Sequence, residues 1–242
     1  MNRVLVLLTT DFPAPGGDSS FLANEIGALS KAFDEVIVFS YYPSDQVLTS
    51  LPTNVRYGGA LTSAPRHLGT KMLLSPGGLR RAARALRMES RRDSRLGQTL
   101  GNIFTGGRFA QLIDDELRAL NIGEEDQVTV YAFWGTHAEL ALPFLPGSDH
   151  AVMRMHGFDL YEDRTADLPL RASLFESTDV VVPISTDGRD YLLSQYSEDV
   201  LDPAKVAVSR LGTADPGRLP QREHSDWPTS GPLRLVSCSS LI

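Results

Sequence analysis

Short runs of apolar residues alternate along the chain with longer stretches in which apolar residues recur every three or four positions. Each short run is apolar throughout, which is typical of strands buried on both faces of a parallel sheet. These runs occupy residues 4–8, 35–39, 54–57, 128–133, 151–155, 179–183 and 205–209. Helical spacing fills the intervals, at residues 21–33, 76–96, 109–120, 137–145, 168–177 and 187–196. The alternation predicts an α/β fold, a Rossmann-like parallel sheet with helices on both faces.

The alternation of strands and helices lies within residues 1–211, which we expect to form one domain. Residues 212–232 are rich in Gly, Pro, Ser, Thr and charged residues, the composition of an interdomain linker. Apolar residues return in 233–242, as at the start of another buried strand. A buried strand needs a following element to cover it, so we expect residues 233–242 to be the first strand of a truncated C-terminal domain.

Composition restricts the class of protein. The chain has 242 residues, of which 42% are hydrophobic and 22% are charged, as in ordinary globular domains. Its opening apolar run, residues 4–8, is far shorter than the about 20 residues of a membrane span or the about 7–15 of a signal segment. The single cysteine, Cys238, excludes an internal disulfide and fits a reducing compartment. We therefore expect a cytoplasmic protein.

Charge is distributed unevenly. Residues 64–108 hold ten Lys and Arg residues and two acidic residues, a net charge of +8. The whole chain has a net charge of −7, so the residues outside this segment together carry −15. Within this segment, residues 76–96 predict an amphipathic helix with four apolar residues on one side: Leu79, Ala82, Ala83 and Leu86. The basic residues that we expect at a membrane surface are Arg80, Arg81, Arg84, Arg87 and Arg91.

Two interpretations of this helix stay open. It could lie on an anionic membrane surface, peripherally at the inner face of the plasma membrane, or it could be a solvated helix covering the sheet. Nucleic acid is a poorer partner, because the rest of the chain is acidic and aromatic residues do not interleave with the arginines.

Ligands of open parallel sheets bind beyond the carboxyl ends of the strands, so the loops there are the places to look for chemistry. The first such loop contains Gly16, Gly17 and Asp18, followed by a predicted helix. Glycine allows close approach of the backbone to a ligand, and a helix N-terminus attracts anions such as phosphate. The loop has neither a G-x-G-x-x-G fingerprint nor the lysine of a P-loop. The alternative is a plain turn with an Asp or Ser N-cap.

A second loop, MRMHGFDLYEDR, places His156, Gly157 and Asp159 at the end of a predicted strand. His156 is positioned to hydrogen-bond a ligand, and the alternative is a structural histidine. These residues are too few for a metal site, which takes three or four protein ligands, so we expect no metal. No G-x-S-x-G or Cys/His arrangement supplies a nucleophile.

Weaker signals come from two further strand ends. Ser185 and Arg189 follow the strand at 179–183, where capping of the next helix alone would explain the serine. Trp134 ends the strand at 128–133 and could line the crevice or pack in the core.

Taken in order, several stretches resemble the N-terminal half of a GT-B fold glycosyltransferase, in the retaining family four. They are FP with a GG loop, FLANEI, HGFD, PISTDGRDYL, VSRLGTADP and LRLVSCSSLI. HGFDLYEDR is similar to enzymes that build capsular or exopolysaccharide chains. One departure is that Ser239-Ser240-Leu241 stands where the family usually has Gly-Arg-Leu.

The resemblance implies transfer of a sugar, with retention, from a nucleotide-diphosphate sugar to a glycan or lipid-linked acceptor. It implies that Gly16 and Gly17 approach the donor phosphates or the acceptor, and that His156 contacts the donor sugar. No cofactor is implied. The family's diphosphate-binding Arg and Lys lie in its second, donor-binding domain, so we expect residues 1–242 alone to be inactive. The alternatives are a stand-alone Rossmann-like nucleotide-binding module without transferase activity and a non-catalytic membrane-surface protein.

Overall fold

A computed structural model describes residues 1–15, 17–43, 50–90, 96–123, 125–146, 148–161 and 170–212. Residues 1–212 form one compact unit built on a six-stranded sheet in the order β3-β2-β1-β4-β5-β6, with every neighbouring pair parallel. The strands are β1 (Arg3–Thr9), β2 (Glu35–Ser40), β3 (Val55–Ala60), β4 (Gln127–Ala132), β5 (His150–Met155) and β6 (Val180–Pro183). The predicted α/β, Rossmann-like fold class is confirmed.

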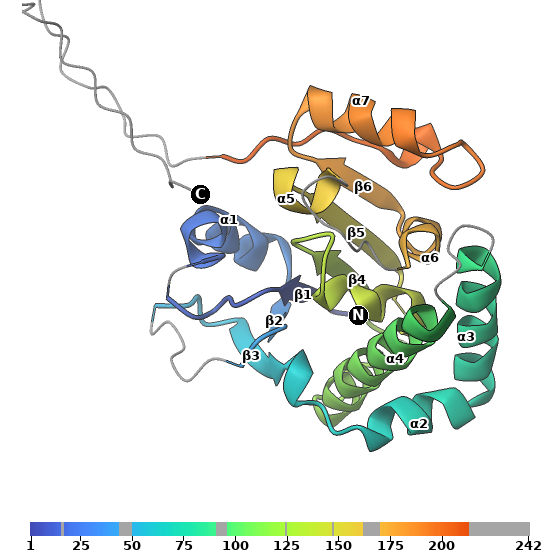
Figure 1. Cartoon of the computed structure of the whole chain (residues 1–242). Helices are drawn as coiled ribbons and strands as arrows, with labels where there is room; N and C mark the ends of the chain where they lie inside the picture. The colour runs from blue at the N-terminus through green and yellow to red at the C-terminus, as the bar shows by residue number, and fades with distance from the viewer. Residues whose placement is uncertain are drawn as a thin grey trace, which may run out of the picture. The chain divides into compact units, whose positions relative to one another are not determined.

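Helices cover both faces of the sheet (Figure 1). They are α1 (Ser19–Ala32), α2 (His67–Leu74), α3 (Pro76–Glu89), α4 (Leu96–Ala119), α5 (Gly157–Leu160), α6 (Arg171–Ser177) and α7 (Thr186–Gln195), with short 3-10 turns η1 (Leu61–Ser63), η2 (Ala138–Phe144) and η3 (Pro203–Lys205). Successive residues of a strand point to opposite faces of the sheet, and a separate hydrophobic core forms on each face. One lies under α1, with Leu22 and Ile26 on Leu5 and Leu7, and the other lies under α4.

Several predicted elements differ in the structure. The helix predicted at 76–96 is α3, which ends at Glu89, and the helix predicted at 109–120 is α4, which already begins at Leu96. The predicted helix at 137–145 is the 3-10 turn η2, because Pro143 lies inside it and lacks the N–H that an α-helix needs. The predicted strand at 205–209 is wrong. Val206 forms only an isolated bridge to Val181, and two backbone hydrogen bonds, from Ala207 to Val181 and from Ser209 to Pro183, hold this segment beside β6.

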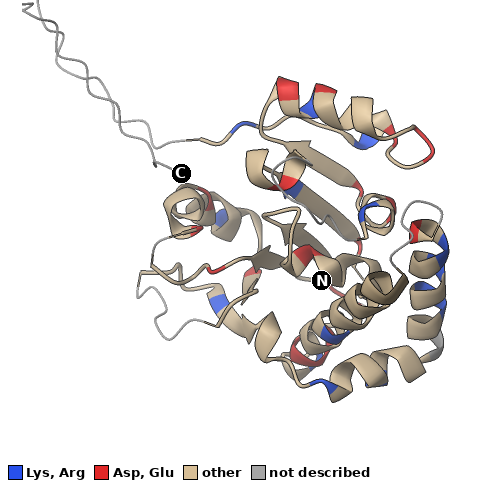
Figure 2. Cartoon of the chain, in the orientation of Figure 1, with Lys and Arg blue, Asp and Glu red and all other residues tan. Residues whose placement is uncertain are grey.

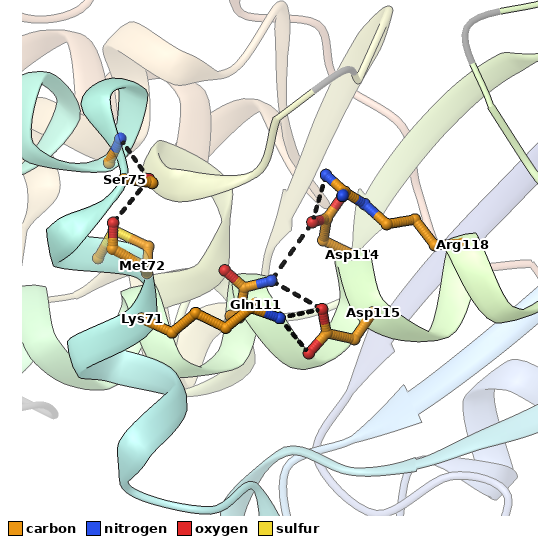
Figure 3. A network of polar contacts seen from close by, with 8 residues as sticks. Lys71, Met72, Ser75, Gln111, Asp114, Asp115 and Arg118 are labelled. Carbon is orange, nitrogen blue, oxygen red and sulfur yellow. Dashed lines mark hydrogen bonds and ion pairs between the residues drawn. The ribbon is translucent and has the colours of Figure 1, made fainter.

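A polar network joins α2 to α4 (Figure 3). Lys71 Nζ lies 2.7 Å from Asp115 Oδ1, and Gln111 donates to both Asp115 and Asp114. At the junction with α3, the hydroxyl of Ser75 accepts from Gly78 N–H at 3.0 Å and caps the helix. The start of α3 is therefore set by the local cap of Ser75, while the contacts of Lys71 and Gln111 hold α2 against α4.

The faces of α3 agree with the predicted ones only in part: Ala82 is buried and Leu86 packs against the core, as predicted, but Leu79 and Ala83 do not. The residues buried on it are Gly78, Ala82, Ala85 and Glu89, whereas Leu79 is 62% exposed and Ala83 is also exposed. Glycine and alanine occupy most of the inward face, where α3 packs against α2, α4 and α6.

The basic residues of α3, which Figure 2 marks in blue, differ from one another in their exposure and in their partners. Arg80 and Arg87 are exposed, and Arg84 pairs with Glu176 of α6 at 2.6 Å. Arg81 is half-buried, and this burial lowers its pKa although the charge of Asp114 opposes the change. Arg81 therefore does not belong to the exposed basic face, while Arg91 lies outside the described residues.

Candidate functional site

The strand order reverses between β1 and β4, so the connections that follow these two strands leave on opposite sides and open a crevice at the carboxyl edge. Three described segments meet there: the loop after β1, the residues after β4 and the residues after β5. Their side chains define the candidate site.

Asp18 ties the loop after β1 to the end of β4. Its Oδ2 accepts from Thr10 N–H at 2.6 Å, and its Oδ1 accepts from the indole Nε1 of Trp134 at 2.7 Å. The side chain does not cap α1, so the predicted capping alternative does not describe it. Burial raises the pKa of Asp18, and the hydrogen bonds from Thr10 and Trp134 oppose that rise.

Gly17 has a conformation that suits glycine. Its φ is +43°, and a Cβ at this position would overlap the carboxylate of Asp11. That carboxylate in turn accepts from Asp18 N–H at 2.9 Å, which closes the turn. Gly16, the other glycine predicted to approach a ligand, lies outside the described residues.

His156 follows β5 directly, beside the loop after β1, as the sequence predicted. Its ring is only 5% exposed, because Trp134 covers it with ring centroids 4.0 Å apart and Phe133 and Phe21 pack around it. The crevice is thus closed over this histidine rather than open. Burial, with a smaller contribution from the charge of Arg154, lowers the pKa of His156 to about 4. The imidazole is therefore neutral at physiological pH.

Asp159 does not face the crevice. It is 0% exposed, and its carboxylate accepts the backbone N–H of Gly135 and, at 2.5 Å, the N–H of His156. Arg171 donates to the carbonyl oxygen of Asp159. Burial raises the pKa of Asp159 to about 6, against the hydrogen bond from Gly135 and the charge of Arg171. Asp159 thus joins two loops, and it was predicted instead to contact a ligand directly.

Of the remaining predicted residues, Gly157 directly follows His156, whereas Ser185 and Arg189 belong to the segment after β6. Gly157 is the first residue of α5 and is half-buried. Ser185 accepts from Gly188 N–H at 3.0 Å and caps α7, which is the alternative that the sequence left open. Arg189 pairs with its neighbour Asp190 at 2.7 Å and is 41% exposed. Neither Ser185 nor Arg189 has a described contact with Trp134 or His156.

Sequence reasoning missed two buried ionisable residues behind the site. Glu139 is 0% exposed, and burial raises its pKa to about 8 despite the nearby charge of Arg171. Arg171 itself is 4% exposed. The signal was present in the sequence, since Glu139 stands in the apolar stretch AELALPF and Arg171 in PLRASLF. A charged residue within an apolar stretch indicates a buried partner.

A second aromatic group lies at the ends of β2 and β4. The ring of His137 is 4.7 Å from that of Tyr41, which in turn packs edge-on against Tyr42. His137 has a φ of 77°, a strained conformation outside glycine. Burial lowers the pKa of His137.

A cavity of about 310 Å³ opens on the α1 face of the sheet, below the site. Its lining includes Glu25 and Arg154, which form an ion pair, and Tyr131, whose hydroxyl lies 3.4 Å from Glu25. Burial raises the pKa of Tyr131 above its usual range. Glu25, Tyr131 and Arg154 thus connect α1 to β4 and β5. Arg154 precedes His156 by two residues, so their side chains lie on the same face of the sheet.

Within the described ranges, no group of three or more His, Cys, Asp or Glu could hold a metal ion. None of the described helices combines the length and the apolar character that crossing a bilayer requires.

No family model matches the chain, and no curated protein matches it either. Among solved structures, it is similar to a UDP-forming α,α-trehalose-phosphate synthase from Burkholderia vietnamiensis, at 15% identity and a TM-score of 0.46, over 87% of this chain and 47% of that one. The α,α-trehalose 6-phosphate synthase from Burkholderia multivorans matches at 15% identity and a TM-score of 0.44, over 87% and 48%. The chain spans about half the length of these structures. Similarity at this level does not identify an activity.

Proposed function

We propose that this chain is the N-terminal, acceptor-side domain of a retaining GT-B glycosyltransferase. The enzyme would move a sugar from a nucleotide-diphosphate sugar to a glycan or lipid-linked acceptor. The observation that carries the proposal is the meeting of Asp18, Trp134 and His156 at the carboxyl edge of the sheet, where the strand order reverses. The loops that supply Asp18 and His156 are among the stretches in which the sequence resembles the family.

The chemistry of the cluster suits a sugar. A neutral imidazole can both donate to and accept from a hydroxyl group, and the low pKa of His156 keeps it neutral over a wide pH range. Trp134 and Phe21, the latter 40% exposed, offer flat apolar surfaces at the mouth of the site. In this proposal Trp134 and Phe21 move aside when the donor sugar reaches His156.

Stabilisation of the leaving diphosphate needs cations and N–H groups. By the family resemblance, these come from a second α/β domain, and residues 1–242 alone bind the donor weakly and transfer no sugar. The proposal also includes an anionic membrane surface as a partner. The support for a membrane partner is a set of exposed residues on two neighbouring helices. They are Arg80, Arg87 and Leu79 on α3 and Leu74 at the end of α2, which is 81% exposed.

The test uses the protein as encoded in its gene, incubated with labelled UDP-glucose, UDP-galactose or GDP-mannose and a lipid extract. His156→Ala should reduce transfer by about 100-fold or more, the scale of a lost group at the reacting centre. Because the ring is buried, this variant should also lose some stability, so transfer is compared at a temperature at which both proteins are folded. The control is His150→Ala, because His150 is exposed at the opposite end of the same strand.

Three outcomes would overturn the proposal. They are the absence of transfer from every donor, an equal effect of both histidine variants, and tight nucleotide-sugar binding by residues 1–242 alone.

A further inference from the structure

Aspartates join neighbouring strands at the amino edge of the sheet. Asp34 accepts from Arg3 N–H at 2.7 Å, Asp149 from Val128 N–H at 2.8 Å, and Asp179 from Ala151 N–H at 2.8 Å. Each of these aspartates is exposed to solvent. An exposed carboxylate keeps part of its hydration while it binds the backbone, so this kind of contact costs little free energy.

Asp159 makes the same kind of contact at the carboxyl edge, in a different environment. Its single carboxylate binds one N–H group beyond each of two adjacent strands, that of Gly135 in the segment after β4 and that of His156 directly after β5. It is fully buried beside the buried Arg171 and Glu139. Burying charged groups costs several kcal/mol per ion, and good pairing only partly offsets that cost. If the only role of Asp159 were to join two strands, an exposed aspartate would do so at a lower cost in free energy.

The buried contact determines how two rings meet. Gly135 directly follows Trp134, and His156 carries the ring against which Trp134 stacks, at a centroid distance of 4.0 Å. Holding both backbone N–H groups on one carboxylate fixes the separation of the two strand ends. The space around Gly135 is filled as well, since a Cβ there would lie 3.3 Å from Asp159 Oδ2 and 3.0 Å from Arg171. Arg171 orients the arrangement through the carbonyl of Asp159.

We propose that Asp159, oriented by Arg171, is a positioning residue that holds the ends of β4 and β5 together and thereby keeps Trp134 stacked on His156. The use of this geometry in sugar binding rests on the proposed function. The geometry itself does not, and it is measurable without substrate.

The experiment compares Asp159→Asn with Asp179→Asn, its matched control at the opposite edge of β5. Both are made in a Trp227→Phe background, so that Trp134 is the only tryptophan. Quenching of Trp134 fluorescence by acrylamide and the ¹H–¹³C resonance of the His156 ring report on the stacked pair, and urea unfolding reports on stability.

Asp159→Asn replaces one acceptor oxygen by an NH₂ group that faces a backbone donor. It should therefore raise the quenching constant by about twofold, through local opening, and shift the His156 resonance. Asp179→Asn should lower stability and leave both signals unchanged. If Asp159→Asn fails to fold, Arg171→Lys serves in its place, with the same direction of change.

The proposal is wrong if folded Asp159→Asn or Arg171→Lys leaves both signals unchanged, or if Asp179→Asn changes them equally. A failure of the proposed function would appear elsewhere, as the absence of transfer by the wild-type protein, and would leave these signals as expected.

Discussion

The indole Nε1 of Trp134 donates to Oδ1 of Asp18 at 2.7 Å and so links the loop after β4 to the loop after β1. Asp18 is only 4% exposed, and it also holds the turn through Thr10 N–H. Trp134 would lose its one fixed polar contact if this carboxylate were removed.

We expect Asp18→Ala to destabilise the protein by about 1–3 kcal/mol, the cost of leaving buried donors unpaired. Trp134 should also become more accessible to acrylamide. Urea unfolding and fluorescence quenching measure the two effects. A stability loss with unchanged quenching would mean that Phe21 and His156, rather than Asp18, hold Trp134 in place.

Glu139 should make stability depend on pH. Its pKa is about 8 in the folded protein and 4.5 in its ordinary state, so the folded chain holds a proton that the unfolded chain has lost between these values. The contribution of Glu139 to the free energy of unfolding is therefore most favourable below pH 4.5. It falls as pH rises toward 8, by up to about 1.4 kcal/mol per pH unit.

Glu139→Gln mimics the protonated form and removes this dependence. Its stability relative to wild type should thus increase steadily from pH 5 to pH 8 in urea unfolding. Glu198→Gln, at an exposed carboxylate, is the matched control. A difference between Glu139→Gln and wild type that does not vary with pH would show that Glu139 is ionised in the fold.

Gly17 and Gly27 should respond oppositely to alanine. Gly17→Ala forces a Cβ onto the carboxylate of Asp11 at a positive φ and should destabilise the loop after β1 by about 1–2 kcal/mol or more. Gly27 lies within α1 with no atom within 4 Å of an added Cβ. Gly27→Ala should therefore stabilise the protein, by up to about 1 kcal/mol. Thermal unfolding distinguishes the two, and equal effects would contradict the loop geometry.

The membrane partner is tested with liposomes that contain anionic lipid, at low salt. Each Arg near such a surface contributes about 1 kcal/mol, so the double variant Arg80→Glu, Arg87→Glu should lose sedimentation with them. The variant Lys31→Glu, Arg210→Glu changes the net charge equally on exposed residues elsewhere. Equal loss in both variants would indicate unspecific attraction, and no binding by wild type would remove the membrane from the proposal.

The sheet was predictable because strands such as β1 and β2 are apolar almost throughout and buried along nearly their whole length, as strands covered on both faces are. The positions of His156 and Trp134 at the carboxyl edge follow from the same pattern. The faces of α3 were not predictable, because the side that is buried depends on how closely α4 and α6 approach. Glu139, Arg171 and the role of Asp159 depend on side chains brought together from separate elements, and local sequence patterns do not show such contacts.

The buried Glu139 makes folding at neutral pH a reaction that takes up a proton. The sequence count of −7 treats every carboxylate as ionised, whereas the folded protein at pH 7 carries about one negative charge fewer at this position. That proton comes from the solution, so the heat of refolding depends on which buffer supplies it. Calorimetry in Tris and in phosphate would differ by the difference in the two buffers' ionisation heats, multiplied by the protons taken up.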